Sequence, residues 1–561
     1  MTASLIIPPG LVLIVGGLLL PLLPRGLRPL VLLGLPLLTL ALVWSLPDGP
    51  VLQAPFLGHE LTLVQADKLS RLFATIFAIM AFAGALFALN QARIVELAAA
   101  FVYAGSAVGV SLAGDLITLF ICWEVMAIGS TLIVWCGGQG AQGAGLRYAA
   151  MHILGGVLLM AGFAGEVAAS GSIAFGKMAL DSLPRWLILA GFLINAGAPP
   201  LSAWLPDAYP ESSWSGMVFL SAFTTKAAVY ALLRGFPGTE LLVYVGLYMV
   251  FYGIVYAILE NDMRRILAYS IVNQVGFMVA GTGIGTEMAL NGAASHAFAH
   301  IIYKALLLMS AGSVLYMTGK RKCTDLGGLF RTMPLTTICG IIGALSISSF
   351  PLTSGFVSKS MISEGAVDQH LPLVWFLLAA GSAGVFLHAG IKFPWFVFFQ
   401  KDSGLRPPDP PWNMRLAMLL FSALCIGIGI LPGPFYAVLP FAVDYVPYTA
   451  SHVVFQLQLL LFSGLAFFLM LGGLKRTLTI TLDVDWLYRR LGFNMARALD
   501  SLAGRVWQWL VASITLGARR VNTRLHQHHG PEGVLGRSWP TGTMAFWTTV
   551  MLAVYLILTN L

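Results

Sequence analysis

The sequence predicts an all-α polytopic membrane protein with about 16 transmembrane helices, and its composition and long apolar segments carry that prediction. Hydrophobic residues make up 58% of the 561 residues and charged residues only 10%, whereas soluble domains carry about 25% charged residues. The mean hydropathy of +0.83 points the same way. Apolar segments of about 20 residues, the length that crosses a bilayer, recur along most of the chain. A soluble enzyme or binding domain is therefore excluded.

Short loops separate most of the expected spans. Residues 1–24 lack a basic leader and a convincing cleavage site, so we interpret them as a first span and not as a removed signal peptide. The spans are predicted at 6–23, 28–46, 69–90, 95–113, 116–136, 148–169, 185–203, 213–234, 241–260, 265–284, 288–318, 333–366, 373–400, 414–432, 453–473 and 543–560.

Lysine and arginine in the short loops predict the orientation. If the N-terminus lies outside, the cytoplasmic loops hold thirteen of these basic residues and the outer loops five. We therefore expect an external N-terminus. The net charge of +8 is mostly a topology signal and does not indicate a nucleic-acid partner.

Residues 484–529 are neither a span nor a short loop. Apolar residues recur there near the helical period, and arginines such as Arg489, Arg490, Arg497, Arg505, Arg519 and Arg520 interleave with them. This pattern predicts an amphipathic helix lying at the cytoplasmic interface. A final anchoring span, 543–560, follows it.

Three bases lie on one apolar helix, in the stretch SHAFAHIIYKALLLMS. His296, His300 and Lys304 are spaced i, i+4 and i+8, so they share one face. Ionisable groups at this depth are rare and usually mark an ion or proton path. The alternative is a polar stripe that joins neighbouring helices. One such residue would be enough for that role, so three in register favour the ion or proton path.

Two further charges lie within apolar spans. Glu124 is flanked by apolar residues in LITLFICWEVMAIGS, and Lys226 lies in VFLSAFTTKAAVYALL. Either could simply pack helices, and Lys226 could reach an interface. It stands eight residues before Arg234, however, which places it at least two turns deep.

Proline and glycine interrupt two spans, in NAGAPPLSAWLPDAYP (195–210) and in SSFPLTSGFVSKSM (348–361). Broken helices persist in membranes only where protein or a wet cavity satisfies the freed backbone groups. Paired breaks in two halves of a transporter point to inverted repeats and a midplane site. Lys359 follows the second break. The predicted broken-helix residues are Pro199, Pro200, Pro351 and Gly355.

The five cysteines are scattered and show no CxxC or Cys/His spacing. We expect no metal site, no iron–sulfur cluster and no other cofactor.

Several long motifs lie in order over about residues 65–365. They are DLITLFICWEVMAIGS, APPLSAWLPDAYP, TTKAAVYALLR, NDMRRILAYSIVNQVGF, HAFAHIIYKALLLMSAGSV, DLGGLFRTMP and FPLTSGFVSK. In these motifs and their order the chain resembles the antiporter-like subunits of respiratory complex I, membrane-bound hydrogenases and Mrp-type cation/proton antiporters, above all the Mrp D subunit. The resemblance implies two inverted repeats, each with a broken helix, at 95–235 and 241–400. Peripheral spans would precede them (1–90) and follow them (413–473).

The resemblance also implies roles for the buried charges. Glu124 would be a glutamate that pairs with a lysine, Lys226 a relay base and Lys359 the terminal base. His296, His300 and Lys304 would form the central relay. The family's usual lysine partner stands nine residues before the tryptophan of WLPDA, and here that position is Asn195. Asparagine cannot carry the proton, so either Glu124 pairs with Lys226 or the first half-channel is altered.

Three functions remain open from the sequence. The chain could be a proton/cation-translocating subunit of a multisubunit Na⁺ or K⁺/H⁺ antiporter, a pumping subunit of a redox complex, or a scaffold with altered transport. The expected partners are other membrane subunits, protons, a monovalent cation and lipid. The expected location is the inner membrane of a prokaryote.

Overall fold

The computed structural model describes residues 7–474 and 483–560, which fall into two units, 1–484 and 485–561. Thirteen of the described helices are long and apolar enough to cross a membrane, and three shorter apolar helices fall on other predicted spans. The all-α prediction is confirmed. The span helices of the first unit are α1 (Pro9–Leu19), α2 (Arg28–Ser45), α3 (Lys68–Phe87), α4 (Ile94–Leu112), α5 (Leu116–Trp135), α6 (Ala141–Ser170), α7 (Leu183–Ala196), α9 (Gly216–Leu220), α10 (Thr224–Gly235), α11 (Leu241–Leu259), α12 (Met263–Ile284), α13 (Glu287–Thr318), α14 (Pro334–Ile347), α15 (Ser354–Asp368), α16 (Pro372–Val385), α17 (Trp412–Ile430) and α19 (Ala450–Leu469).

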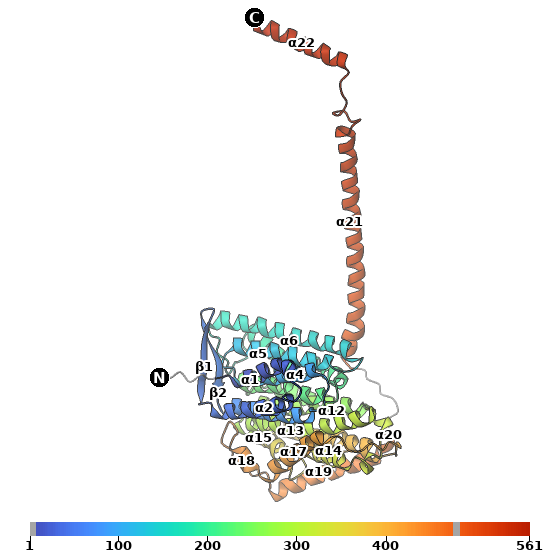
Figure 1. Cartoon of the computed structure of the whole chain (residues 1–561). Helices are drawn as coiled ribbons and strands as arrows, with labels where there is room; N and C mark the ends of the chain where they lie inside the picture. Colours follow the sequence, from blue (N-terminus) through green and yellow to red (C-terminus); the bar gives the residue numbers. More distant parts are fainter. Residues whose placement is uncertain (1–6, 475–482, 561) are drawn as a thin grey trace. The chain divides into compact units, whose positions relative to one another are not determined.

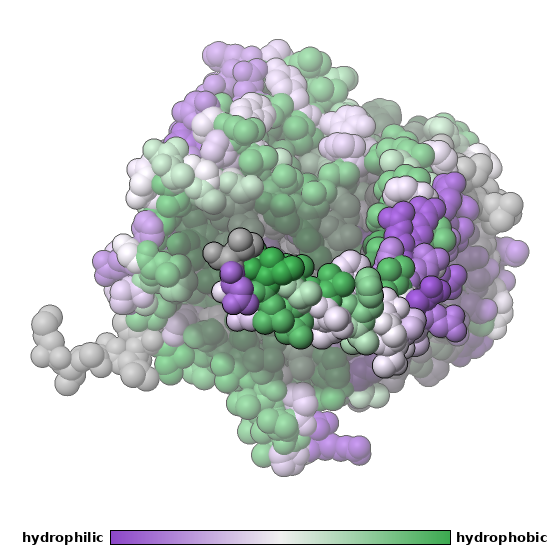
Figure 2. All heavy atoms as spheres, turned by 90° about the horizontal axis from the view of Figure 1, so that it is seen from above, coloured by the Kyte–Doolittle hydropathy of each residue, from purple (hydrophilic) through white to green (hydrophobic). Residues whose placement is uncertain are grey.

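Helices α12 and α13 form the centre of the first unit, since nearly all of their residues are buried. Figure 1 shows the other helices running roughly alongside them. Apolar side chains cover much of the surface visible in Figure 2. Polar groups on α12 and α13 are therefore enclosed by protein and not exposed to lipid.

Glycines allow α11 to approach α12 closely. A methyl group added at Gly246 would lie 2.4 Å from the backbone nitrogen of Ala280, and one at Gly276 would lie 2.6 Å from the carbonyl oxygen of Gly246. No side chain larger than hydrogen fits this contact without moving a helix.

A β-hairpin, which the sequence analysis did not predict, lies between α2 and α3. Strand β1 (Gly49–Phe56) pairs antiparallel with β2 (His59–Ala66). The backbone N–H of Gly114 donates to the carbonyl of Thr62, and the Thr62 N–H donates to the Asp115 carboxylate at 2.7 Å. The hairpin thus covers one end of the bundle (Figure 1).

Both predicted helix breaks are present, and there is a third. Helix α7 ends at Ala196 and a short helix, α8 (Trp204–Ala208), follows the break. The second break separates α14 from α15. The third, at 221–223, separates α9 from α10.

The second unit, described by itself, contains the π-helix η7 (Leu487–Gly492), α21 (Phe493–His529) and α22 (Thr541–Thr559). The predicted helix over 484–529 is confirmed, although its first turns are π-helical. Its position at a membrane interface stays a prediction.

Candidate functional site

The three predicted bases of α13 are fully buried on one continuous helix. His296, His300 and Lys304 each expose 0% of their surface. The rings of His296 and His300 lie 6.3 Å apart. The row spans about 12 Å along the helix axis.

Three hydroxyl or amide groups contact the His296 ring. Its Nε2 lies 3.1 Å from Gln274 Oε1 on α12 and 3.2 Å from the Tyr303 hydroxyl, which itself donates to Gln274 Oε1. Its Nδ1 lies 3.1 Å from Ser358 Oγ on α15. His296 therefore connects α13 to two other helices.

The Ser358 hydroxyl has one proton and three candidate acceptors, namely His296 Nδ1 and the carbonyls of Ser354 and, at 3.4 Å, Gly355. It lies 2.9 Å from the carbonyl of Ser354 as well as 3.1 Å from His296 Nδ1. When His296 is neutral with a proton on Nε2, Ser358 donates to Nδ1. When His296 carries both protons, Nδ1–H donates to Ser358, which then donates to Ser354.

Lys304 and His300 lie on the other side of His296. Lys304 Nζ donates to Ser270 Oγ on α12 at 2.8 Å. Neither nitrogen of His300 has a hydrogen-bond partner among the described residues. The cations that act on His300 include Lys226 and Lys304, so the imidazole lies within electrostatic range of both lysines.

Lys226 binds the backbone that the third helix break sets free. Its Nζ donates to the carbonyl of Ser221 at 2.7 Å and to Thr225 Oγ1 at 3.1 Å. It forms no ion pair with Glu124. The first alternative from the sequence, a direct Glu124–Lys226 pair, is therefore wrong in this structure.

Lys359 occupies the corresponding place at the second break. Its Nζ donates to the carbonyl of Ile347, the last residue of α14, at 3.0 Å. It also lies 4.8 Å from the centroid of the Phe277 ring. Like Lys226 and Lys304, it has no carboxylate within ion-pair distance among the residues that the structure describes.

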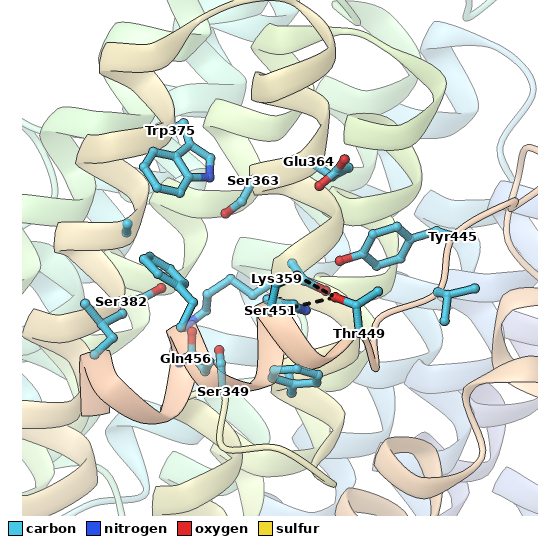
Figure 3. Close-up of a pocket in the computed structure, with 17 residues that line it drawn as sticks. Ser349, Lys359, Ser363, Glu364, Trp375, Ser382, Tyr445, Thr449, Ser451 and Gln456 are labelled. Carbon is cyan, nitrogen blue, oxygen red and sulfur yellow. Dashed lines mark hydrogen bonds between the residues drawn. The ribbon is translucent and has the colours of Figure 1, made fainter. Parts of the chain in front are cut away.

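A cavity of about 590 Å³ reaches Lys359 (Figure 3). The Lys359 side chain runs toward Gln456, and Ser349 and Glu364 also line the space. The cavity extends to the loop before α19. Another part of that loop, at Phe441, shares a second cavity with the β-hairpin, so the first cavity faces the hairpin end of the bundle.

Glu124 and Asn195 lie against α6. Glu124 is half-buried, and its Oε1 has no hydrogen-bond partner in the described ranges. Asn195 is fully buried, and its amide donates to the carbonyl of Gly191 at 3.0 Å. The broken-helix residues Pro199 and Pro200 lie in the interruption after α7, Pro351 lies in that before α15, and Gly355 lies in the first turn of α15.

Sequence reasoning missed two buried bases in the π-helical part of the span after α15. His388 is fully buried, and Lys392, four residues later, donates to the carbonyls of Ala257, Ile258 and Glu260 at the end of α11. Their i, i+4 spacing repeats that of His300 and Lys304 and could have revealed them.

Ion pairs fix the opposite end of the bundle. Arg147 holds Asp207 of α8 with bonds of 2.6 and 3.0 Å. Arg321 contacts Glu211 at 2.9 Å and Asp262 at 2.8 Å. Burial raises the pKa of Asp262 above its usual range although Arg321 opposes the shift. The pairs at Asp207 and Glu211 anchor the part of the chain that follows the first break.

Comparisons with known proteins agree with this architecture. Residues 113–387 match the family described as NADH:quinone oxidoreductase/Mrp antiporter, transmembrane. The chain is 29% identical over 350 residues to the D subunit of the Na⁺/H⁺ antiporter of Alkalihalophilus pseudofirmus, covering 58% of this chain and 71% of that protein. It is also 29% identical over 352 residues to the N subunit of the NADH-quinone oxidoreductase of Desulforudis audaxviator, covering 58% and 70%.

The fold is shared with a chain in the structure of the Mrp complex from Dietzia sp. DQ12-45-1b. The TM-score is 0.75 at 22% identity, and the match covers 92% of this chain and 62% of that one. The likeness therefore extends well beyond residues 113–387.

Proposed function

We propose that this chain, an antiporter-like membrane subunit related to those of Mrp antiporters and respiratory complex I, conducts protons sideways through the middle of the bilayer as part of a cation/proton antiporter. The observation that carries the proposal is the buried row of bases, in which the Ser358 hydroxyl links His296 to α15. The relay consists of Lys226, Lys304, His300, His296, Ser358 and Lys359.

We infer the order along the relay from helix spacing, from electrostatic range and from the contacts of His296. Lys304 lies one turn beyond His300 on α13, and Lys226 lies within electrostatic range of His300. His300 is next to His296 on α13, and Ser358 links His296 to the helix of Lys359. A proton arriving at Lys226 repels charge on the neighbouring bases, so occupancy of one favours release from the next. Histidine suits the centre because its ordinary pKa lies near working pH.

The cavity at Lys359 supplies the exit to the hairpin end of the bundle. With the N-terminus outside, the hairpin end is the outer face of a prokaryotic inner membrane. The two halves, 95–235 and 241–400, would act as inverted repeats, each with a lysine that binds freed carbonyls. Na⁺ or K⁺ would be the exchanged cation, and the partners would be other membrane subunits.

Replacing Lys304 by Ala in the native complex, reconstituted in vesicles, tests the proposal. We expect proton movement coupled to a cation gradient to disappear while the complex still assembles. Lys320→Ala, at an exposed loop position, is the matched control and should transport normally. Unchanged exchange in Lys304→Ala would refute the relay.

The alternative is a pumping subunit of a redox-driven complex, because the relatives include a quinone oxidoreductase subunit. Purifying the native complex separates the two. Iron–sulfur subunits would favour the redox complex, and small hydrophobic partners would favour the antiporter. A scaffold role is excluded if Glu124→Gln abolishes exchange in the chain that carries Asn195.

A further inference from the structure

A cluster of buried polar groups without partners surrounds the Asn195 position. Atoms that form no hydrogen bond among the described residues include Glu124 Oε1, His152 Nε2, Asn195 Oδ1, Tyr148 Oη and Tyr209 Oη. Native proteins leave few buried polar atoms unsatisfied, and several in one place indicate internal water. Of these groups, Glu124 alone has a role in the function proposed above.

Two glycines of α6 bring these groups together. A methyl group added at Gly156 would lie 2.3 Å from Glu124 Oε1, and one at Gly155 would lie 2.8 Å from Asn195 Nδ2. His152 precedes Gly156 by four residues, so it shares their face of α6 about 6 Å along the axis. The Glu124 carboxylate, the Asn195 amide and the His152 imidazole thus face one small gap beside Gly155 and Gly156, which is called the notch below.

We propose that His152 carries the proton in the first half of the chain, as the partner of Glu124 that Asn195 cannot be. The inference rests on the proposed proton-conducting function. His152 is 4% exposed, and the Asn195 side chain is near enough to influence its ring. Neither His152 Nε2 nor Asn195 Oδ1 forms a hydrogen bond among the described residues. The proton leaves the Glu124 carboxylic acid, crosses water in the notch and binds Nε2, which leaves a carboxylate and an imidazolium.

Tyrosines extend the path from His152 toward Lys226. The Tyr148 ring lies 4.1 Å from the His152 ring and 6.3 Å from the Tyr209 ring, centroid to centroid. Beyond them, the Tyr103 hydroxyl lies 2.7 Å from Thr224 Oγ1, two residues before Lys226. Hydroxyl groups donate and accept at once, so they can pass the proton on.

The charged and titratable groups around His152 fit this role. Helix α5 presents Glu124, and α8, which packs against α6, carries Asp207, to which Arg147 binds. The remaining titratable neighbours are the three tyrosines, Tyr148 on α6, Tyr209 after α8 and Tyr103 on α4. Glu124 is therefore the carboxylate available to stabilise an imidazolium.

The test measures proton flux in vesicles that contain the intact complex with His152→Gln, with His152→Gln/Asn195→Lys, with Lys304→Ala, and with His59→Gln. We expect His152→Gln to lose at least tenfold in flux. The added lysine at 195 should restore most of it and extend the active range to higher pH, because lysine holds a proton to higher pH than histidine. His59, on the hairpin, should not matter.

Each outcome supports or overturns one of the two proposals. If His152→Gln keeps flux within twofold of the parent while Lys304→Ala is inactive, the role of His152 is overturned and the proposed function stands. A loss that Asn195→Lys does not restore in an assembled complex assigns His152 a structural role and also overturns it. Flux retained in Lys304→Ala refutes the proposed function itself. His152→Asn, a smaller side chain, serves in place of His152→Gln if that variant does not assemble.

Discussion

Replacing Ser358 by Ala should slow proton passage between the two halves of the relay without unfolding the chain. Ser358 is the link between His296 Nδ1 and α15, and its hydroxyl lies within hydrogen-bond distance of both His296 Nδ1 and the carbonyl of Ser354. In Ser358→Ala, protonated Nδ1 loses its acceptor.

The size of the effect follows from that one bond. A hydrogen bond to a charged group contributes about 1.5–3 kcal/mol. Losing it from the protonated His296 raises the barrier by a similar amount, and each 1.36 kcal/mol is a factor of ten in rate. We therefore expect flux to fall roughly 10- to 150-fold. The free energy of unfolding should drop by only about 1 kcal/mol.

The assay is proton flux into vesicles, followed with an entrapped pH-sensitive dye, under an imposed cation gradient. Ser358→Thr keeps the hydroxyl and should retain most of the flux. Ser111→Ala removes another buried hydroxyl, whose one hydrogen bond among the described residues goes to the carbonyl of Val108, and this variant should transport normally. Flux in Ser358→Ala within twofold of the parent would refute the hydroxyl link.

Three further outcomes follow from contacts away from the relay. Burial raises the pKa of Asp67, but Arg234, at 2.7 Å, and Ser70 outweigh it and leave the pKa below its usual range. Asp67→Asn keeps a capping side chain on α3 and should lower the free energy of unfolding by less than about 1 kcal/mol at neutral pH. Because the carboxylate stabilises the fold only while ionised, this difference should vanish as pH falls through the lowered pKa of Asp67; a pH-independent difference in thermal unfolding would contradict the ion pair. Gly276→Val should push α11 away from α12 and lower the free energy of unfolding by about 3 kcal/mol or more. The yield of folded protein in detergent should fall, and a normal yield would contradict the close contact. Lys392→Met removes the donor to three carbonyls at the end of α11 and should lower the free energy of unfolding by about 3 kcal/mol. An unchanged midpoint of thermal unfolding would show that water replaces the lysine's hydrogen bonds.

Much of the fold could be predicted because the local amino-acid composition identifies membrane spans. Apolar length located the helices, and proline and glycine located the breaks after α7 and before α15. The break at 221–223 escaped prediction because SAF contains neither proline nor glycine. The hairpin at 49–66 also escaped, because an apolar pair of strands between two spans resembles an ordinary loop.

The candidate site was only partly predictable. Intramembrane charge singled out Glu124, Lys226 and the bases of α13 from the sequence alone. Their partners could not be found that way, because Gln274 and Ser358 come from other helices and are ordinary polar residues in sequence. Tertiary packing alone places them beside His296.

Lys226 and Lys359 share one structural feature, a bond to a carbonyl at the end of an interrupted helix. Such an end carries about half a negative elementary charge. A carboxylate counterion would hold an ammonium tightly and turn the lysine into a trap for the proton. In the proposed relay, the weaker, immobile attraction would make each lysine a shallow resting place that a proton can leave.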